Sequence, residues 1–121
     1  MEIREKAIGD VYIVSIEGRM DTANSKDVES RLDQVIEDKR EKMLIDLAGV
    51  DYISSVGLRV LLASLKRHRE RRGKMALISL QPFVQDVFRI TGLEKIFPIY
   101  SSEAEAMACF KPNDAENCSN P

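Results

Sequence analysis

The sequence predicts an α/β fold in which helices alternate with the strands of one central, mostly parallel sheet. Two short and almost continuous apolar runs, at residues 43–47 and 75–80, have the length and composition of strands that are buried on both faces. Each run follows a segment whose apolar residues recur at helical spacing. Strands that alternate with helices pair in parallel through crossover connections, so we expect a single sheet with helices packed against it.

The first eighteen residues predict a hairpin that adds one antiparallel strand at the amino-terminal end of the sheet. Residues 3–8 and 11–16 carry strand-favouring side chains, and Gly9 and Asp10 form the turn between them. Gly18 is expected to end the second strand.

An amphipathic helix is expected next, beginning near Asp21 and Thr22 and ending near Lys39. Asp21 and Thr22 are both residue types that cap helices. The apolar positions that follow fall at i, i+4, i+7 and i+8 and therefore share one helix face. They are Val28, Leu32, Val35 and Ile36.

The strand at residues 43–47 is followed by a predicted turn over residues 48–54 and then by the helix with the clearest periodicity. Gly73 follows a basic last turn and is expected to stop this helix. The apolar face of the helix consists of Leu58, Leu61, Leu62 and Leu65.

After the strand at residues 75–80, Pro82 fits the first turn of a third helix that Gly92 closes. An extended segment at residues 93–100 leads to a last helix, for which Ser102 and Glu105 form a capping-box pattern. The predicted order is therefore ββαβαβαβα. The predicted core includes Leu32, Leu44, Leu61, Leu65, Leu77 and Val87.

The length of 121 residues suits one domain, which we expect over residues 1–110. Residues 111–121 are polar and are predicted to form a disordered tail. No apolar run approaches the roughly 20 residues that span a bilayer, and the amino terminus lacks the apolar stretch of a signal peptide. We therefore expect a cytoplasmic protein without membrane insertion, and a monomer when free.

Composition excludes several kinds of chemistry. The six glycines form neither a phosphate-binding loop nor a G-x-G-x-x-G turn, and a single histidine leaves little for metal or triad sites. We therefore expect no enzyme activity, cofactor or metal. Carboxylates such as Asp46 and Asp51 could do acid/base work, but near strand ends they more often solvate a turn.

Seven basic residues between Lys66 and Lys74 form the one marked charge cluster. A nucleic-acid-binding protein could use such a run, but the net charge is −2 and no aromatic residues are interleaved for base stacking. A helix carboxyl terminus also attracts cations. We predict no direct nucleic-acid binding, and steering of an acidic partner as a possible role.

Two adjacent serines, Ser54 and Ser55, lie at the predicted start of the second helix, after the central strand and its turn. The simplest interpretation is structural, with Ser54 as the helix cap and Ser55 in the first turn. On these residues alone, that interpretation is preferred.

Segments on either side of this junction resemble the STAS domains of anti-sigma factor antagonists, small proteins that relieve sigma-factor inhibition by partner switching. Residues 18–21 (GRMD) are similar to the family's G-x-[LIM]-D turn before the first helix. Residues 45–53 (IDLAGVDYI) resemble its central strand and the loop after it, and residues 82–97 resemble its third helix and exit. Together these motifs are specific, and they imply a STAS-type fold.

In that family the loop commonly reads D-S-[ST]-G-L, and the serine after the aspartate is phosphorylated by the cognate anti-sigma factor. Matching Gly57 and Leu58 to this pattern puts Ser55 at the phosphorylated serine, whereas Ser54 replaces the aspartate and Val56 the second hydroxyl. The partner-binding residues that the resemblance implies are Asp21, Ser54, Ser55, Val56, Gly57 and Leu58.

The resemblance implies an anti-sigma factor antagonist that binds an anti-sigma factor serine kinase when unphosphorylated and so frees the sigma factor. Phosphorylation of Ser55 would inactivate it, and a PP2C-type phosphatase would reverse the modification. An alternative is a structural STAS subunit of a signalling scaffold or membrane-transport complex that is never phosphorylated. A nucleotide-binding or catalytic module is a third hypothesis, which the missing phosphate loop disfavours.

Overall fold

One five-stranded sheet, with strand order β1-β2-β3-β4-β5, forms the centre of the computed structural model, which describes residues 1–110. The strands are β1 (Glu2–Ile8), β2 (Val11–Met20), β3 (Lys42–Ile53), β4 (Lys74–Ile78) and β5 (Ile99–Tyr100). The helices are α1 (Ser25–Glu37), α2 (Ser55–Glu70), α3 (Pro82–Ile90) and α4 (Glu103–Cys109), with a 3₁₀ turn at Leu93–Lys95. The predicted tail lies outside the described residues.

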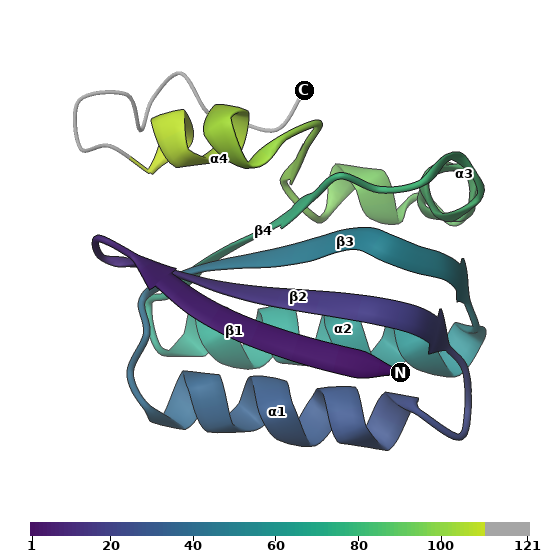
Figure 1. The fold of residues 1–121 in the computed structure, drawn as a ribbon, viewed down its shortest axis with the longest axis horizontal. Helices are drawn as coiled ribbons and strands as arrows, with labels where there is room; N and C mark the ends of the chain where they lie inside the picture. The colour runs from purple at the N-terminus through teal and green to yellow at the C-terminus, as the bar shows by residue number, and fades with distance from the viewer. Residues whose placement is uncertain (111–121) are drawn as a thin grey trace.

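The fold class and the element order ββαβαβαβα are confirmed. β1 pairs antiparallel with β2, and every other neighbouring pair in the sheet is parallel. α1 and α2 lie side by side under one face of the sheet, and α4 lies on the opposite side (Figure 1). Among the described residues, no helix is long and apolar enough to cross a membrane.

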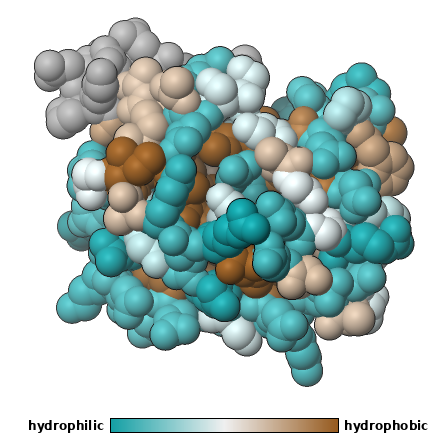
Figure 2. All heavy atoms as spheres, in the orientation of Figure 1, coloured by the Kyte–Doolittle hydropathy of each residue, from teal (hydrophilic) through white to brown (hydrophobic). Residues whose placement is uncertain are grey.

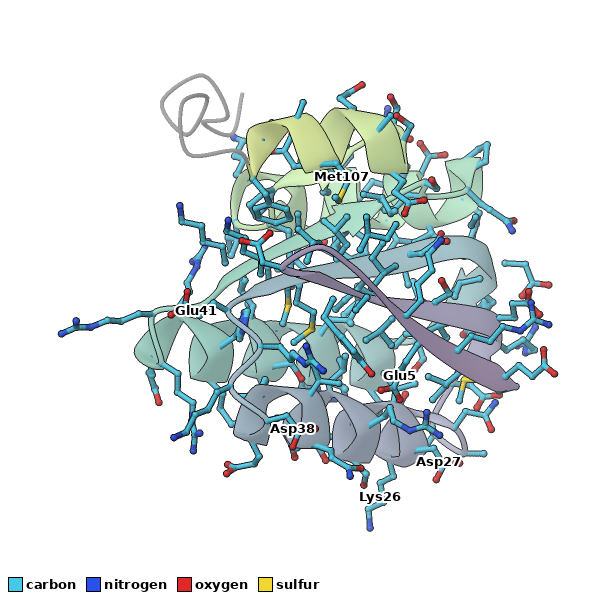
Figure 3. The ribbon with its side chains drawn as sticks, turned by 60° about the vertical axis from the view of Figure 1, so that its left-hand side comes forward. Glu5, Lys26, Asp27, Asp38, Glu41 and Met107 are labelled. Carbon is cyan, nitrogen blue, oxygen red and sulfur yellow. The ribbon has the colours of Figure 1, made fainter. Side chains whose placement is uncertain are left out.

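β3 is buried on both faces, as its apolar run predicts. Ile45 and Leu47 join the large core cluster between the sheet and helices α1 and α2, whereas Leu44 joins a smaller cluster that α4 covers. Met107 of α4 packs against this smaller cluster (Figure 3). Five of the six predicted core residues are buried: Leu32, Leu44, Leu61, Leu65 and Leu77.

The sixth predicted core residue, Val87, is only partly buried and packs at the margin of the large cluster. α3 instead buries Val84 and Phe88, and the Phe88 ring meets Phe97 edge to face with centroids 5.6 Å apart. Because nine residues offer a narrow buried face, Phe83 and Ile90 on the same helix remain exposed.

The turn predicted over residues 48–54 is wrong, because β3 continues to Ile53. Two register shifts opposite β2 accommodate the residues that suggested a turn. At the first, the Asp46 carboxylate accepts a hydrogen bond from the Ala48 N–H at 2.9 Å. Gly49 is needed there because a Cβ would collide with the side chain of Glu17 on β2. Because β3 extends to Ile53, only Ser54 separates it from the first residue of α2.

The predicted ends of α1 are also displaced. Neither Asp21 nor Thr22 is the N-cap; Asn24 occupies that position, and the helix ends at Glu37. Asp21 stabilises the turn before the helix, because its Oδ1 accepts a hydrogen bond from the Asn24 N–H at 3.1 Å. β2 likewise continues through Gly18, which adopts φ of +115°, to Met20.

α2 ends at Glu70, close to the predicted end, but Gly73 is not the left-handed residue that terminates it. Arg72, with φ of 62°, is the left-handed residue after the helix. Gly73 is required because a Cβ at that position would collide with the buried His68 ring. The His68 Nε2 lies 2.6 Å from the Arg40 carbonyl oxygen, which ties the end of α2 to the start of β3.

Glu5 links the edge strand β1 to the helix α1. Its carboxylate accepts hydrogen bonds from the Tyr12 hydroxyl and from Arg31 of α1, both at 2.5 Å (Figure 3). Partial burial alone would raise the pKa of Glu5, but these hydrogen bonds and the Arg31 charge outweigh burial and lower the pKa below its usual 4.5. The ionised carboxylate is therefore favoured by folding.

Glu5→Gln should lower the free energy of unfolding by about 1 kcal/mol at neutral pH. A carboxyl whose pKa is lowered by folding stabilises the protein above its unfolded pKa, near 4.5, and loses this effect as pH falls through the folded value. Urea unfolding from pH 7 to 3 should therefore show the difference from wild type shrinking below about pH 4.5. Glu2→Gln, an exposed glutamate of the same strand, is the control.

Candidate functional site

Ser54 closes the junction between β3 and α2 with three hydrogen bonds. Its hydroxyl accepts from the Gly57 N–H at 3.1 Å, and its carbonyl accepts from the Leu58 N–H at 2.9 Å. Its own N–H donates to the Met20 carbonyl at 2.8 Å, which joins α2 to the end of β2. The sequence-based assignment of Ser54 as the helix cap is confirmed.

Ser55 is the first residue of α2 and is exposed. The hydroxyl therefore belongs to the first turn, where free N–H groups and the helix dipole favour a negative charge. The first turn of α2 contains no acidic side chain that would repel such a charge. An anionic group on Ser55 would thus meet a favourable field from its own helix.

Gly57 lets the amino end of α2 lie directly against β2 and β3. A Cβ at this buried position would sit 3.0 Å from both the Met20 carbonyl oxygen and the Ile53 side chain. The residues on either side, Val56 and Leu58, are half-buried, and Leu58 packs against the large core cluster. Glycine is therefore required by the close approach that holds Ser54 and Ser55 in place.

Asp21 lies beside this junction because it directly follows Met20. The Asp21 carboxylate is half-buried, is bonded to the Asn24 N–H and lies 3.8 Å from the Arg19 Nε. The structure thus brings the two predicted parts of the site together, the turn at Asp21 and the residues at 54–58.

Three further residues adjoin the junction, and the sequence pattern did not single them out. The Arg19 guanidinium lies over the Tyr52 ring, 4.2 Å from its centroid. The Tyr52 ring stacks on Phe83 of α3, with centroids 6.0 Å apart and planes 15° apart.

The two carboxylates considered for acid/base chemistry differ in their surroundings. Asp46, one of the carboxylates considered for acid/base chemistry, is engaged by the Ala48 N–H and lies 3.3 Å from the Ser15 hydroxyl. Asp51 is exposed. Over residues 1–110, no group of three or more histidine, cysteine, aspartate or glutamate residues is placed to hold a metal ion.

Comparison with known proteins gives matches over most of the chain. A model of the STAS domain family matches residues 2–106. BtrV of Bordetella bronchiseptica, named as an anti-sigma factor antagonist, is 35% identical over 92% of this chain and 96% of its own. An anti-sigma F factor antagonist of Paenibacillus polymyxa is 32% identical over 80% of this chain and 84% of its own.

Solved structures give the same result. The crystal structure of a Thermotoga maritima protein described as an anti-sigma factor antagonist superposes with a TM-score of 0.83 at 27% identity, covering 88% of this chain and 92% of that one. Because the family model matches nearly the whole described chain and relatives more than 30% identical cover most of it, the chain belongs to the STAS domain family.

Proposed function

We propose that this protein is an anti-sigma factor antagonist that binds an anti-sigma factor serine kinase while Ser55 is unphosphorylated, and so frees a sigma factor. The observation that carries the proposal is the exposed Ser55 hydroxyl in the first turn of α2, next to a serine that already caps the helix. Because Ser54 satisfies the structural need, Ser55 is available for modification. The names of the relatives support the antagonist part of this role.

A phosphate on Ser55 would leave the domain folded. It adds about −1.5 to −2 charges at neutral pH, at the end of the helix whose dipole and free N–H groups stabilise anions. The Gly57 N–H stays bonded to Ser54, and the Ser54 N–H stays bonded to Met20, because neither bond involves Ser55. The modification therefore changes the charge of the surface at Ser55 and leaves the hydrogen bonds that hold the start of α2 intact.

The same phosphate would oppose a partner that packs over Ser55. Such a partner must strip water from the charge or face it with its own, and each 1.4 kcal/mol of penalty weakens binding about tenfold. We propose that the kinase thereby releases its own inhibitor, and that a PP2C-type phosphatase restores the binding form. In this scheme the protein is a cytoplasmic, monomeric substrate of both enzymes and is not itself an enzyme.

The proposal is tested by incubating the chain with ATP and each anti-sigma factor kinase of its organism, followed by mass spectrometry of residues 46–66. Phosphate should appear on Ser55 with at least one kinase. Ser55→Ala should abolish it. Ser54→Ala should retain it, while losing about 1 kcal/mol of stability with the cap.

Phosphate found on Ser54 instead would refute the assignment of the switch. A chain that binds a membrane or scaffold complex, and that no kinase of this class labels, would instead be the unphosphorylated structural subunit.

A further inference from the structure

α3 presents an apolar stripe to solvent where a surface helix is ordinarily polar. Phe83, Val87 and Ile90 fall at i, i+4 and i+7 and therefore share one face of the helix. Phe83 is 52% exposed and Ile90 is 77% exposed, the two highest values among the exposed large hydrophobic side chains of residues 1–110. Figure 2 shows apolar surface at the end of the molecule where Figure 1 places α3.

The stripe continues onto β3 through a rigid stack. Phe83 lies against Tyr52, and Tyr52 lies beneath Arg19, so three side chains from three elements hold one another in place. The Gln81 side chain donates to the Ala48 carbonyl at 2.6 Å and fastens the start of α3 to β3. Tyrosine and arginine held rigidly at a surface are the residue types that most often dominate binding energy in interfaces.

The stack adjoins the proposed switch. Ser55 follows Tyr52 by three residues, so their Cα atoms are at most about 10 Å apart. Arg19 precedes Met20, whose carbonyl is bonded to Ser54. A partner that covers Ser55 in a contact of ordinary size, about 800 Å² on each side, can therefore extend to Tyr52 and to Phe83, the near end of the stripe.

The positive charge of Arg19 indicates that the partner contributes an acidic group to this surface. The Arg19 guanidinium is exposed, and its Nε lies 3.8 Å from the Asp21 carboxylate. A carboxylate on the partner would complete its pairing.

We propose that the anti-sigma factor docks on the apolar stripe of Tyr52, Phe83, Val87 and Ile90, with aliphatic side chains against α3 and a carboxylate facing Arg19. This inference rests on the proposed function, since it names the surface that the same partner covers. It adds that α3, which lies outside the predicted site residues, contributes much of the affinity.

The test is titration calorimetry of Ile90→Ser against the kinase that labels Ser55. Ile90 is exposed, so the variant should melt like wild type, and its affinity should fall about tenfold or more. Phe83→Ser should weaken binding by a similar factor, and its melting temperature, measured alongside, reports the loss of the stack on Tyr52. Ile8→Ser, an isoleucine 40% exposed on the edge strand β1, is the matched control and should bind within about twofold of wild type.

Wild-type affinity in both α3 variants would overturn the inference, and if Ser55→Asp still weakened binding, the proposed function would stand without it. Light scattering, which measures the oligomeric state, tests whether a second copy of the chain covers the stripe instead. A wild-type dimer that Ile90→Ser dissociates would mean that a second copy covers the stripe, and would overturn the inference as well.

Discussion

Ser55→Asp should fold like the wild type and bind the anti-sigma factor at least about tenfold more weakly. The aspartate lies in the first turn of α2, where a carboxylate complements the helix dipole and no other acidic side chain competes with it. At the interface, the same charge must be stripped of water or repelled. The change therefore separates folding from binding, and titration calorimetry beside thermal melting measures both.

Ser55→Ala is the matched control, because it removes the hydroxyl without adding bulk or charge. It should bind with wild-type affinity and resist phosphorylation, so that the protein is locked in its binding form. The authentic phosphoprotein should bind more weakly than Ser55→Asp, since aspartate carries about one charge against the phosphate's −1.5 to −2. Equal affinity of wild type, Ser55→Asp and phosphoprotein would show that Ser55 is not the switch.

Local patterns along the chain were sufficient to predict the elements that depend on local physics. α2 has a continuous apolar stripe and a serine cap, and Ser102 accepts from the Glu105 N–H at 3.1 Å, as the capping pattern predicts. Ser54 and Ser55 could be placed at the start of a helix for the same reason. Such features involve residues within four positions of one another, so the sequence displays them directly.

Features that depend on distant contacts could not be predicted in this way. The predicted turn over residues 48–54 contains Gly49 and Asp51, residue types that are common in turns. In the structure the pairing with β2 continues past two register shifts, and Gly49 is required by Glu17, which lies 32 positions earlier. The stack of Arg19, Tyr52 and Phe83 was missed for the same reason, since three elements must assemble before it exists.

Leu61→Ala should give the largest loss of stability, about 2 to 5 kcal/mol of the unfolding free energy. Leu61 is fully buried in the large core cluster, in the second turn of α2. Truncation removes apolar contacts and leaves a cavity that helix and sheet cannot readily fill, because Gly57 and Ser54 hold the start of α2 against β2 and β3. Domains of this size are stable by about 5 to 15 kcal/mol, so much of the total would be lost.

Leu62→Ala is the matched control, because this neighbouring leucine is only half-buried and its truncation removes less buried apolar area. Urea unfolding followed by circular dichroism gives both values, and the cost at Leu62 should be clearly the smaller. A near-zero cost at Leu61 would contradict the packing of α2 against the sheet. Since the same packing presents Ser55 to solvent at the first turn, Leu61→Ala should also weaken partner binding in proportion to the fraction of unfolded protein, with the Ser55 hydroxyl itself untouched.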